Sequence, residues 1–581
     1  MRVGYFDLEA ANWDSFLVGG YLPEGESTPT LVWHSPEDFL DALASHPGTE
    51  WRAHYSGRYD SLLLLTLAAR RGWTLGVTTR GASVLKARLT PPGEKKARIT
   101  LTDTFALAPV GLAKLAKAAG QTQKGEIDFE DERFVAGLSP SSPLGRQLAE
   151  YLTADVLALR DGDVAWRQVL RDVAGVEPAL TLGATAWKSA QARLVEHDLS
   201  EDVKVALQKH EYNDGRAAYF GGRVEVLRTE TPLVWRYDRN SSYPAALTRQ
   251  PVPVGRRRWR TTWDGEEGTV WARVTVPECR HPPLPIRLGS GRLVFPTGTF
   301  EGAWTTHELR RAVDVGVRIE QVLRARIAEE TTDALAGWCW HVWRARQSMQ
   351  PWQGLLKLLA NSLTGKLAQR DERTNTFYGP VERMPKDAEQ LTTVRDGRLW
   401  WRTESHVIGP CARPEWAAYL AAEARVELHR QLLEAGDQSA YCDTDSVYSR
   451  ERLTRGLGTE LGEWKLEGTG ADWRAAAPKL YRYETDGHAH VRGRGLRGLT
   501  PEGYERLTEP PKPGADRYKW ESSAGVRTLL GSLKRHGEAR FERASLRRGL
   551  APPTQWVGSR LRRTGGDTRP PTYAEALALW D

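Results

Sequence analysis

Two aspartates one residue apart stand inside an otherwise apolar segment, Tyr441-Cys442-Asp443-Thr444-Asp445-Ser446-Val447-Tyr448. Like charges side by side in a low dielectric repel each other unless a cation or a proton lies between them. The flanking residues favour β-strands. The segment therefore predicts a turn between two strands that points Asp443 and Asp445 at a metal. Taken alone, Asp-x-Asp is more often a plain turn or a solvated surface, and the residues at 447 and 448 exclude a calcium loop.

Size and composition limit the class of protein. At 581 residues the chain is long enough for several domains with sizeable cores. No run of about 18 apolar residues occurs, so we expect no membrane span. An acidic residue at position 7 comes too early for a signal peptide. The four cysteines (Cys279, Cys339, Cys411 and Cys442) have no C-x-x-C spacing, which argues against a disulfide framework or a zinc site and suits a reducing cytoplasm.

Positive charge is concentrated near the C-terminus. The whole chain has a net charge of +7, and residues 526–565 alone carry ten Lys/Arg against two Glu, a local +8. A basic segment on a nearly neutral body predicts polyanion binding, with a solvated helix face as the alternative. A second cluster, Arg256-Arg257-Arg258-Trp259-Arg260, suits phosphate contact and base stacking as well as a solvated strand.

Strand and helix patterns alternate through residues 1–175, which is typical of an α/β domain. The expected strands are 2–8, 31–34, 51–54 and 97–102, and the expected helices are 36–44, 61–71 and 142–159. Proline-rich breaks near 251–253, 282–285 and 510–513 mark expected domain or insertion edges. Residues 338–368 predict mainly helix, with a break near Pro351.

A second candidate metal ligand is Asp238. A β-rich run ends there, and the chain then turns toward a helix that Tyr243-Pro244 interrupts or starts. An aspartate at a strand end is well placed for a metal, although a helix N-cap is its commoner role.

The segment 353–366 predicts a leucine-rich helix with one polar stripe. Lys357, Asn361, Thr364 and Gly365 form that stripe at i, i+4, i+7 and i+8. Glycine costs about 1 kcal/mol in a helix interior, which makes sense if a ligand must approach the backbone there. An ordinary amphipathic helix with a solvated stripe is the alternative.

The first domain also carries acidic residues in pairs. Asp7 and Glu9 alternate on one expected strand, so both side chains face the same way. Asp60 closes the run Tyr55 to Asp60, and Tyr151 and Asp155 lie one turn apart on one helix face. Four such carboxylates can hold two magnesium ions that activate water against a phosphodiester, whereas each acid taken separately is more typical of a surface.

One motif matches a dinucleotide-binding fingerprint, but its position in the chain argues against that fold. Gly493-Arg494-Gly495-Leu496-Arg497-Gly498 matches G-x-G-x-x-G, but it belongs to no βαβ unit and carries arginine inside the loop. It predicts an arginine-bearing loop against nucleic-acid phosphates. The chain contains no P-loop, H-E-x-x-H or G-x-S-x-G.

Taken together, these segments resemble the family B DNA polymerases, and within them the protein-primed type of phages and linear plasmids. The matches run in order over nearly the whole chain. The matching segments are Asp7/Glu9, Asp60 and Tyr151/Asp155 for the three exonuclease motifs, Tyr219-Phe220-Gly221-Gly222 for Tyr-x-Gly-Gly, Asp238 to Pro244 for Asp-x-x-Ser-Leu-Tyr-Pro, Lys357 to Gly365 for Lys-x-x-x-Asn-Ser-x-Tyr-Gly, Tyr441 to Ser446 for Tyr-x-Asp-Thr-Asp-Ser, and Lys479-Leu480-Tyr481 for Lys-x-Tyr.

The resemblance implies catalytic roles. Asp238 and Asp445 would hold two Mg²⁺ ions, for which Mn²⁺ can substitute, with Asp443 as a supporting acid. One ion would lower the pKa of the primer 3′-hydroxyl, and the other would steady the triphosphate and the leaving pyrophosphate. The exonuclease metal ligands would be Asp7, Glu9, Asp60 and Asp155, with Tyr151 orienting the attacking water.

The resemblance also implies nucleotide and DNA contacts. Lys357, helped by Arg344 or Arg346, would pair with the triphosphate, and Tyr243 would block a ribose 2′-hydroxyl. Asn361 and Gly365 would border the nascent base pair. The residues that would contact DNA are Tyr219, Gly221, Gly222, Ser241, Ser362, Lys479 and Tyr481, the last two at the primer end.

The expected fold is an α/β and α+β multidomain protein. A ribonuclease-H-like 3′–5′ exonuclease domain would be followed by a right-hand polymerase of palm, fingers and thumb with two insertions. The expected boundaries are 1–180 for the exonuclease, 181–249 and 407–495 for the palm, 250–330 and 371–406 for the insertions, 331–370 for the fingers and 496–581 for the thumb with the basic segment. In the subfamily the insertions contact the terminal protein, wrap the template and aid strand displacement.

The sequence departs from the family pattern at three places. Thr364 stands where tyrosine is usual, which puts base selection or nucleotide affinity in question. Ser242 stands where leucine is usual, a packing change. The second exonuclease motif has Tyr55 and Ser56 where an asparagine usually helps to hold the single-stranded end, so we expect weaker proofreading with the metal carboxylates intact.

The expected protein is a template-directed DNA polymerase with a 3′–5′ exonuclease, starting on a terminal protein. Its expected partners are primer/template DNA, dNTPs, the terminal protein and a single-stranded-DNA-binding protein. We expect a monomer in the cytoplasm, the bacterial host's if the gene is a phage's. The alternatives are a family B polymerase that extends ordinary primers, a nuclease whose polymerase half only binds DNA, and a non-enzymatic DNA-binding factor.

Overall fold

The computed structural model of the protein describes residues 2–11, 15–81, 83–121, 127, 138–509, 518–526, 528–539, 543–548 and 555–580. The basic segment 526–565 therefore lies partly outside the described residues, so its expected role in polyanion binding stays a prediction.

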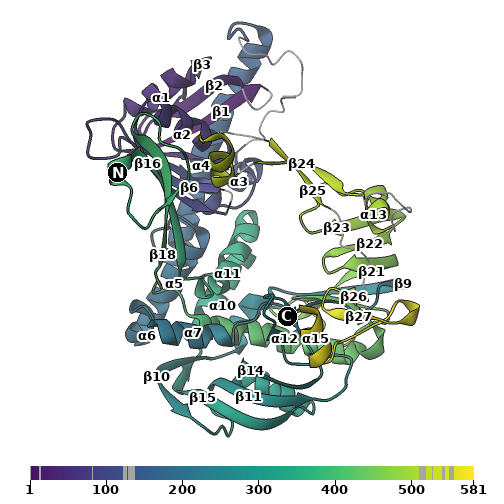
Figure 1. The fold of residues 1–581 in the computed structure, drawn as a ribbon. Helices are drawn as coiled ribbons and strands as arrows, with labels where there is room; N and C mark the ends of the chain where they lie inside the picture. Colours follow the sequence, from purple (N-terminus) through teal and green to yellow (C-terminus); the bar gives the residue numbers. More distant parts are fainter. Residues whose placement is uncertain are drawn as a thin grey trace.

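The N-terminal body is a mixed sheet covered by helices, drawn in purple and blue in Figure 1. Its central strands β1 and β4, and β4 and β7, pair in parallel, and the remaining neighbours pair antiparallel. The elements of this body are β1 (Arg2–Ala11), β2 (Ser15–Leu22), β3 (Thr30–Trp33), α1 (Pro36–Ala44), β4 (Thr49–Ala53), α2 (Asp60–Arg70), β5 (Thr74–Arg80), β6 (Ser83–Thr90), β7 (Ile99–Asp103), α3 (Leu112–Ala118) and α4 (Pro143–Ala174).

A seven-stranded antiparallel sheet forms the second body, in the order β23-β22-β21-β9-β20-β19-β8. Its strands come from two distant parts of the chain. They are β8 (Val224–Val226), β9 (Glu230–Arg239), β19 (Ser439–Asp443), β20 (Ser446–Ser449), β21 (Trp464–Ala477), β22 (Leu480–Thr485) and β23 (His488–Gly493). We call it the palm sheet.

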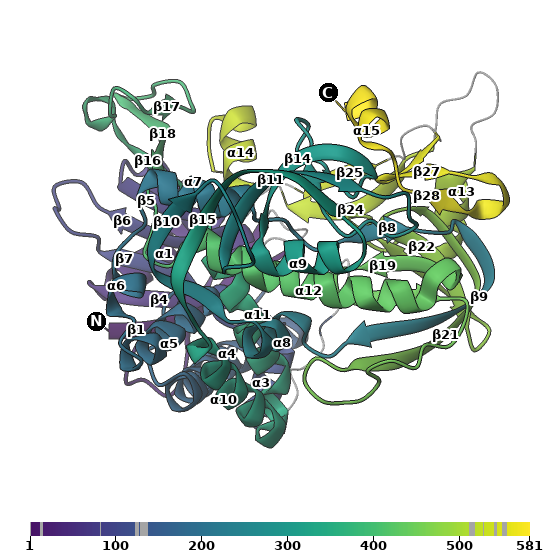
Figure 2. The same ribbon diagram turned by 90° about the horizontal axis from the view of Figure 1, so that it is seen from below.

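Helices pack between the two bodies around one large apolar core. That core is built from the end of α4 and from α5, α8, α10, α11 and α12. The helices added here are α5 (Leu182–Glu196), α6 (Ser200–Lys204), α7 (Lys209–Ala217), α8 (Ser242–Arg249), α10 (Ala334–Ser348), α11 (Gln353–Leu367) and α12 (Pro414–Ala435). Helix α12 is buried along most of its length and packs on β19 and β20 (Figure 2).

Two stretches add sheets to this framework. Residues 252–332 form a four-stranded sheet, β10-β15-β11-β14, whose buried face has its own core. Residues 372–406 form β16, β17 and β18, which extend the N-terminal sheet because β16 pairs with β5. The elements are β10 (Val252–Arg260), β11 (Gly268–Val276), β12 (Ile286–Arg287), β13 (Leu293–Val294), β14 (Gly298–Thr305), α9 (Thr306–Asp314), β15 (Arg318–Thr332), β16 (Glu372–Pro380), β17 (Glu389–Gln390) and β18 (Arg398–His406).

The C-terminal region links both bodies. Helix α14 packs its leucines into the core of the N-terminal sheet, whereas the last strands return to the palm sheet. The elements are α13 (Pro501–Thr508), β24 (Trp520–Val526), α14 (Leu529–His536), β25 (Arg543–Arg548), β26 (Trp556–Val557), β27 (Arg560–Arg562), β28 (Thr568–Arg569) and α15 (Tyr573–Trp580).

Most expected elements of the first domain form, with differences at their ends. Helix 36–44 is confirmed as α1, but the helix expected over 142–159 continues to Ala174. Strands β2, β5 and β6 were not expected. The helical stretch 338–368 and its break are confirmed by α10 and α11, with a short 3₁₀ turn at Gln350–Trp352 between them. No helix among the described residues is long and apolar enough to cross a membrane.

Candidate metal centres

The predicted hairpin turn is present in the palm sheet. β19 ends at Asp443, β20 begins at Ser446, and Thr444 has a left-handed φ of +60°. On the neighbouring strand β9, Asp238 pairs directly with Ser446. The carbonyl of Asp445 also accepts the backbone N–H of the residue after Asp238, at 2.7 Å. The two carboxylates are thus brought together by strand register, and Asp238 is a strand residue and no helix N-cap.

Asp238 and Asp445 repel each other in a partly buried site. Burial first and Asp445 second raise the pKa of Asp238 to about 7. Burial and then Asp443 raise the pKa of Asp445. The positive charge of Lys357 opposes both shifts. A hard divalent cation with oxygen ligands fits this pair, because it would relieve the repulsion.

Asp443 has a different environment from its neighbour. The ammonium of Lys479 donates to both of its carboxylate oxygens at 2.6 Å. The hydroxyls of Tyr441 and Thr444 donate to it at 3.2 Å each. Its charge is therefore balanced by the protein itself.

Lys479 itself lies on a tight turn, with a left-handed φ of +61°. Its backbone N–H donates to the hydroxyl of Tyr441 at 3.1 Å. Beyond it, Tyr481 packs among the rings of Tyr441 and Trp473, and its hydroxyl lies 3.1 Å from that of Tyr448. The Lys-x-Tyr segment is thus fixed against the strands of the hairpin.

Helices α8, α10 and α11 place basic groups beside the carboxylate pair. Lys357, Arg346 and Ser241 line one narrow crevice between these helices. Arg346 donates to the hydroxyl of Ser241 at 2.9 Å, and Ser241 has a left-handed φ of +49° just before α8. Arg344 is exposed on α10 and does not line the crevice. Of the two arginines expected near the triphosphate, only Arg346 therefore lies beside Lys357.

Tyr243 lies in the first turn of α8. Burial, then Tyr219, raise the pKa of its phenol to about 12, and Asp445 also contributes. Tyr243 is therefore close to both the Tyr-x-Gly-Gly segment and the hairpin. The helix starts at Ser242, so Tyr243-Pro244 opens this helix and does not interrupt it.

The polar stripe expected on α11 is only partly present. Gly365 is exposed, and a Cβ added there would meet no atom within 4 Å. Thr364 was wrongly placed on the stripe, because it is 5% exposed. Helices α5, α8, α10 and α12 pack around α11, and its residues Leu363, Thr364 and Leu367 are buried. Ser362 donates its hydroxyl to the carbonyl of Leu359 within the helix and lies against α5.

The Tyr-x-Gly-Gly segment adjoins the hairpin turn. A Cβ on Gly222 would lie 2.5 Å from the Thr444 hydroxyl, so only glycine fits this approach. Arg425 of α12 donates to the carbonyls of Phe220 and Gly221 at 2.7 and 3.0 Å. Its guanidinium is itself held by a buried ion pair with Glu308, at 2.7 Å.

Two arginines contact Tyr219, and a third lies near one of them. Arg216 stacks on its ring at 5.1 Å, and Arg287 donates to its carbonyl at 3.5 Å. Burial, and after it the positive charges of Arg216 and Arg370, lower the pKa of Arg287. No ion pair to any of the three arginines occurs among the described residues. Such a rim attracts an anion.

The carboxylates expected in the N-terminal body gather beside β1. One oxygen each from Asp7, Glu9 and Asp155 lie within 4.8 Å of one another, an arrangement of hard ligands that fits Mg²⁺. Asp60 begins α2 and is buried; burial first and Asp7 second raise its pKa well above the usual range. Tyr151 lies one turn before Asp155 on α4.

Sequence reasoning missed Asp103, which holds the loop that leads to Asp60. Its carboxylate accepts backbone N–H groups from Tyr55 at 2.8 Å, Gly57 at 3.2 Å and Phe105 at 2.9 Å. Tyr55 has a left-handed φ of +61° at this point. The available signal was an aspartate just past the expected strand 97–102, a common position for a side chain that caps a turn.

Comparisons with known proteins give similarities over most of the chain. Residues 141–398 match the family model described as DNA polymerase type B, organellar and viral. The chain is 25% identical over 438 residues to the DNA-directed DNA polymerase of Enterobacteria phage PRD1, a match that covers 70% of each chain. The chain is thus similar to type B DNA polymerases, the family that its motifs resemble.

Fungal relatives are longer than this chain. Probable DNA polymerases of Ascobolus immersus and Neurospora intermedia are each 22% identical to it, over 503 and 376 residues. The chain spans 41% and 38% of their lengths.

Solved structures show the same fold. Phi29 DNA polymerase complexed with primer-template DNA and incoming nucleotide substrates superposes with a TM-score of 0.70 at 17% identity, covering 90% of this chain and 96% of that one. Its complex with primer-template DNA alone also gives 0.70, at 16% identity, over 94% and 99% of the two chains. The chain thus has the expected α/β and α+β multidomain fold.

Proposed function

We propose that this protein adds dNMPs to a primer 3′-hydroxyl under the direction of a DNA template. The observation that carries the proposal is the pair Asp238 and Asp445, two opposed carboxylates within the electrostatic reach of Lys357. Mg²⁺ ions held by Asp238 and Asp445 would supply the Lewis acidity that activates the hydroxyl and stabilises the leaving pyrophosphate. Most of the remaining catalysis is positioning and charge stabilisation by the protein.

The protein groups around the pair have separate tasks in this proposal. Lys357 and Arg346 bind the triphosphate from the crevice that they share. Tyr243 stands beside Asp445 as the group that excludes a ribose 2′-hydroxyl. Lys479 holds Asp443 and, with Tyr481, faces the primer end.

DNA reaches the site along the Tyr-x-Gly-Gly segment. The rim of Arg216, Arg287 and Arg370 around Tyr219 supports a phosphate contact there. Because such contacts release counterions, we expect affinity for DNA to fall steeply with salt. The exposed Trp259, with Arg324 stacked 4.9 Å from its ring, supports a further basic and aromatic surface on the four-stranded sheet.

We also propose a 3′–5′ exonuclease at the N-terminal centre. Asp7, Glu9 and Asp155, with Asp60 beside them, would hold the metal ions, and Tyr151 would orient the attacking water. Tyr55 and Ser56, which replace the usual asparagine, lie in the loop held by Asp103.

Priming by a terminal protein is the finer part of the proposal. It is supported by the relation to a phage polymerase and by the two added sheet regions, 252–332 and 372–406, in the chain positions expected for the insertions. In this proposal the domain boundaries given above hold, and the protein works in the cytoplasm of its host. Extension of ordinary primers without a terminal protein is the second candidate.

The deciding experiment is extension of a labelled primer on a longer template with Mg²⁺ and dNTPs. Wild type should extend it, Asp445→Ala should not, and both should digest the primer when dNTPs are withheld. Digestion without extension by wild type would leave either a terminal-protein requirement or a nuclease. Incubation with a candidate terminal protein and one dNTP, followed by detection of a covalent protein–dNMP adduct, separates those two outcomes.

A further inference from the structure

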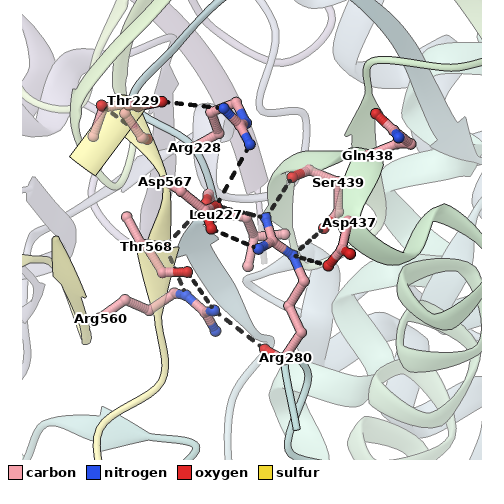
Figure 3. A network of polar contacts seen from close by, with 12 residues as sticks. Leu227, Arg228, Thr229, Arg280, Asp437, Gln438, Ser439, Arg560, Asp567 and Thr568 are labelled. Atoms are coloured by element: carbon pink, nitrogen blue, oxygen red, sulfur yellow. Dashed lines mark hydrogen bonds and ion pairs between the residues drawn. The ribbon is translucent and has the colours of Figure 1, made fainter. Parts of the chain in front are cut away.

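The last described segment of the chain, 555–580, returns to the edge of the palm sheet (Figure 3). The Thr568 hydroxyl lies within 2.8 and 3.0 Å of the carbonyls of Val226 and Leu227, and its backbone N–H donates to the latter. The N–H of Thr229 donates to the carbonyl of Gly566 at 2.6 Å. This segment, which we call the C-terminal clasp, thus runs along β8 and the start of β9.

The first contact of the clasp with β8 is a buried cluster of charged side chains. Arg560 of the clasp lies 3.4 Å from Glu225 of β8, and Arg223 lies 2.6 Å from the same carboxylate oxygen. All three side chains are at most 1% exposed. The remaining donors of Arg560 reach the hydroxyl and carbonyl of Thr568 and the carbonyl of Arg280, at 2.9 to 3.2 Å.

This cluster is electrostatically demanding. Burial lowers the pKa of Arg560 and the charge of Glu225 raises it, and the net result is a pKa of about 10. The two arginines hold the pKa of Glu225 below its usual value although burial alone would raise it. Two buried cations and one buried anion are stable only while each keeps its charged and hydrogen-bonding partners.

The cluster is directly connected to the catalytic turn. β8 pairs with β19, so Glu225 is opposite Cys442 and Val224 is opposite Asp443. The carbonyl of Arg223 accepts the backbone N–H of Thr444 at 2.7 Å. A shift of Glu225 or Arg223 would therefore move the turn that carries Asp443 and Asp445.

A second contact of the clasp holds the other end of β19. Asp567 of the clasp forms an ion pair with Arg280 at 2.9 Å. The same guanidinium donates to the hydroxyl of Ser439 at 3.3 Å and to its carbonyl at 3.2 Å, and Ser439 is the first residue of β19 (Figure 3). Both ends of the five-residue strand β19 are therefore tied, through Arg280 and Glu225, to residues of the clasp.

We propose that the C-terminal clasp sets the position of the catalytic hairpin, with Arg560 as the principal positioning residue. This inference rests on the proposed polymerase function of Asp238 and Asp445. Arg560 touches neither nucleotide nor metal in this scheme and acts through Glu225, Arg223 and the Thr444 N–H. The exonuclease carboxylates lie on β1, α2 and α4, which take no part in the clasp.

The test compares Arg560→Met with Arg569→Met in the full-length chain. Methionine keeps most of the length and removes the charge, and Arg569 is a matched control because it lies in the same segment but pairs with Glu575 at the surface. Extension rate, half-saturating Mg²⁺ and dNTP concentrations, and primer digestion are measured for each. We expect Arg560→Met to lower the extension rate on the order of 10²-fold, the effect of a misplacement of about 1 Å, and to raise the Mg²⁺ requirement. The KM for dNTP and the digestion rate should stay at the wild-type values.

The outcomes distinguish a positioning role from general destabilisation. Arg560→Lys should recover part of the extension rate, because it restores the charge with fewer donors. If Arg560→Met fails to fold and digestion is lost as well, Thr568→Val is the variant that tests the proposal. It removes the hydroxyl contacts without burying an unpaired charge. Extension by Thr568→Val or Arg560→Met at the wild-type rate and Mg²⁺ requirement would overturn the clasp proposal alone. Absence of extension by wild type would count against the polymerase function itself.

Discussion

At the scale of single residues, the three palm aspartates differ in how their charge is balanced. Lys479 and two hydroxyls neutralise Asp443 from within the protein. The mutual repulsion of Asp238 and Asp445 is offset only in part by more distant lysines, Lys357 first among them. In the proposed function, a proton and a cation therefore compete for this pair.

This competition predicts how the metal requirement depends on pH. Without metal, burial and Asp445 raise the pKa of Asp238 to about 7, so below that pH the proton occupies the site. We expect the half-saturating Mg²⁺ concentration for extension to rise about fivefold from pH 7 to pH 6 and to change little between pH 8 and pH 9. Primer extension titrated with Mg²⁺ at each pH measures this. A requirement that is the same from pH 6 to pH 8 would contradict the assignment of Asp238.

Gly365 predicts a conflict between stability and activity. Its Cβ position is open space in the protein, so Gly365→Ala should raise the thermal midpoint by a gain of about 1 kcal/mol in helix propensity. If the nascent base pair occupies that space, the same methyl group should slow extension by about tenfold, the effect of mild overpacking. Thermal unfolding and single-nucleotide addition test the two effects. Gly337→Ala, on the exposed side of α10, is the matched control and should stabilise without slowing.

Residue-level patterns predicted part of this site. The Asp-x-Asp turn and the strand end at Asp238 follow from local sequence, because a carboxylate inside a β-rich run is costly to bury without a cation or a proton. Such patterns could not predict that Arg346 lines the crevice, that Thr364 is buried or that Lys479 pairs with Asp443. Each depends on which helix or strand covers which face, a property of the tertiary fold.

At the scale of elements, the N-terminal carboxylate centre depends on one loop between β4 and α2. Asp103 fixes that loop through three backbone N–H groups, and Asp60 follows directly after it. The strand 97–102 was predictable from its alternation, but not its pairing beside β4, which makes Asp103 adjacent to the loop. Likewise, the periodicity of residues 142–159 predicted a helix, whereas its continuation to Ala174 depends on packing at Trp166, which stacks on Trp352.

Asp103 therefore predicts a selective defect. Asp103→Asn keeps the shape, but it removes the charge and sets an amide NH2 donor opposite backbone N–H groups. The expected loss is about 1.5–3 kcal/mol, the value of a hydrogen bond to a charged group. Displacement of Asp60 should lower primer digestion by about tenfold or more, while extension is retained. Asp41→Asn, which breaks a surface pair with Arg71, should change neither. Equal loss of both activities would mean that Asp103 acts on the whole fold.

At the scale of the whole molecule, the C-terminal region closes a connection between the two bodies. Leu529 and Leu533 of α14 are buried in the core of the N-terminal sheet, to which Trp400 of β18 also belongs. Ion pairs from Lys534 to Glu389 at 3.2 Å and from Arg70 to Glu538 at 3.0 Å lie around this contact. The chain thus runs from the N-terminal body through the palm sheet and back again (Figure 1).

This closure predicts an effect on product length. Leu533→Asp buries a charge in an apolar core and should undock α14. We expect single-nucleotide addition to continue, while products made in one binding event, with excess unlabelled DNA as a trap, become several-fold shorter. Lys534→Ala removes only an exposed ion pair, worth at most about 1 kcal/mol, and should leave product length near wild type. Unchanged lengths for Leu533→Asp would show that the contact does not retain DNA.

The C-terminal clasp also imposes an order on the folding of the protein during its synthesis. Arg560 lies 335 residues after the Glu225 that it contacts, so at about 5–20 residues per second the ribosome makes β8 roughly 20–70 s before its partner. The N-terminal sheet and its carboxylates can fold during that interval, whereas the palm hairpin cannot take its final position. Each new molecule should therefore be able to degrade DNA before it is able to copy it.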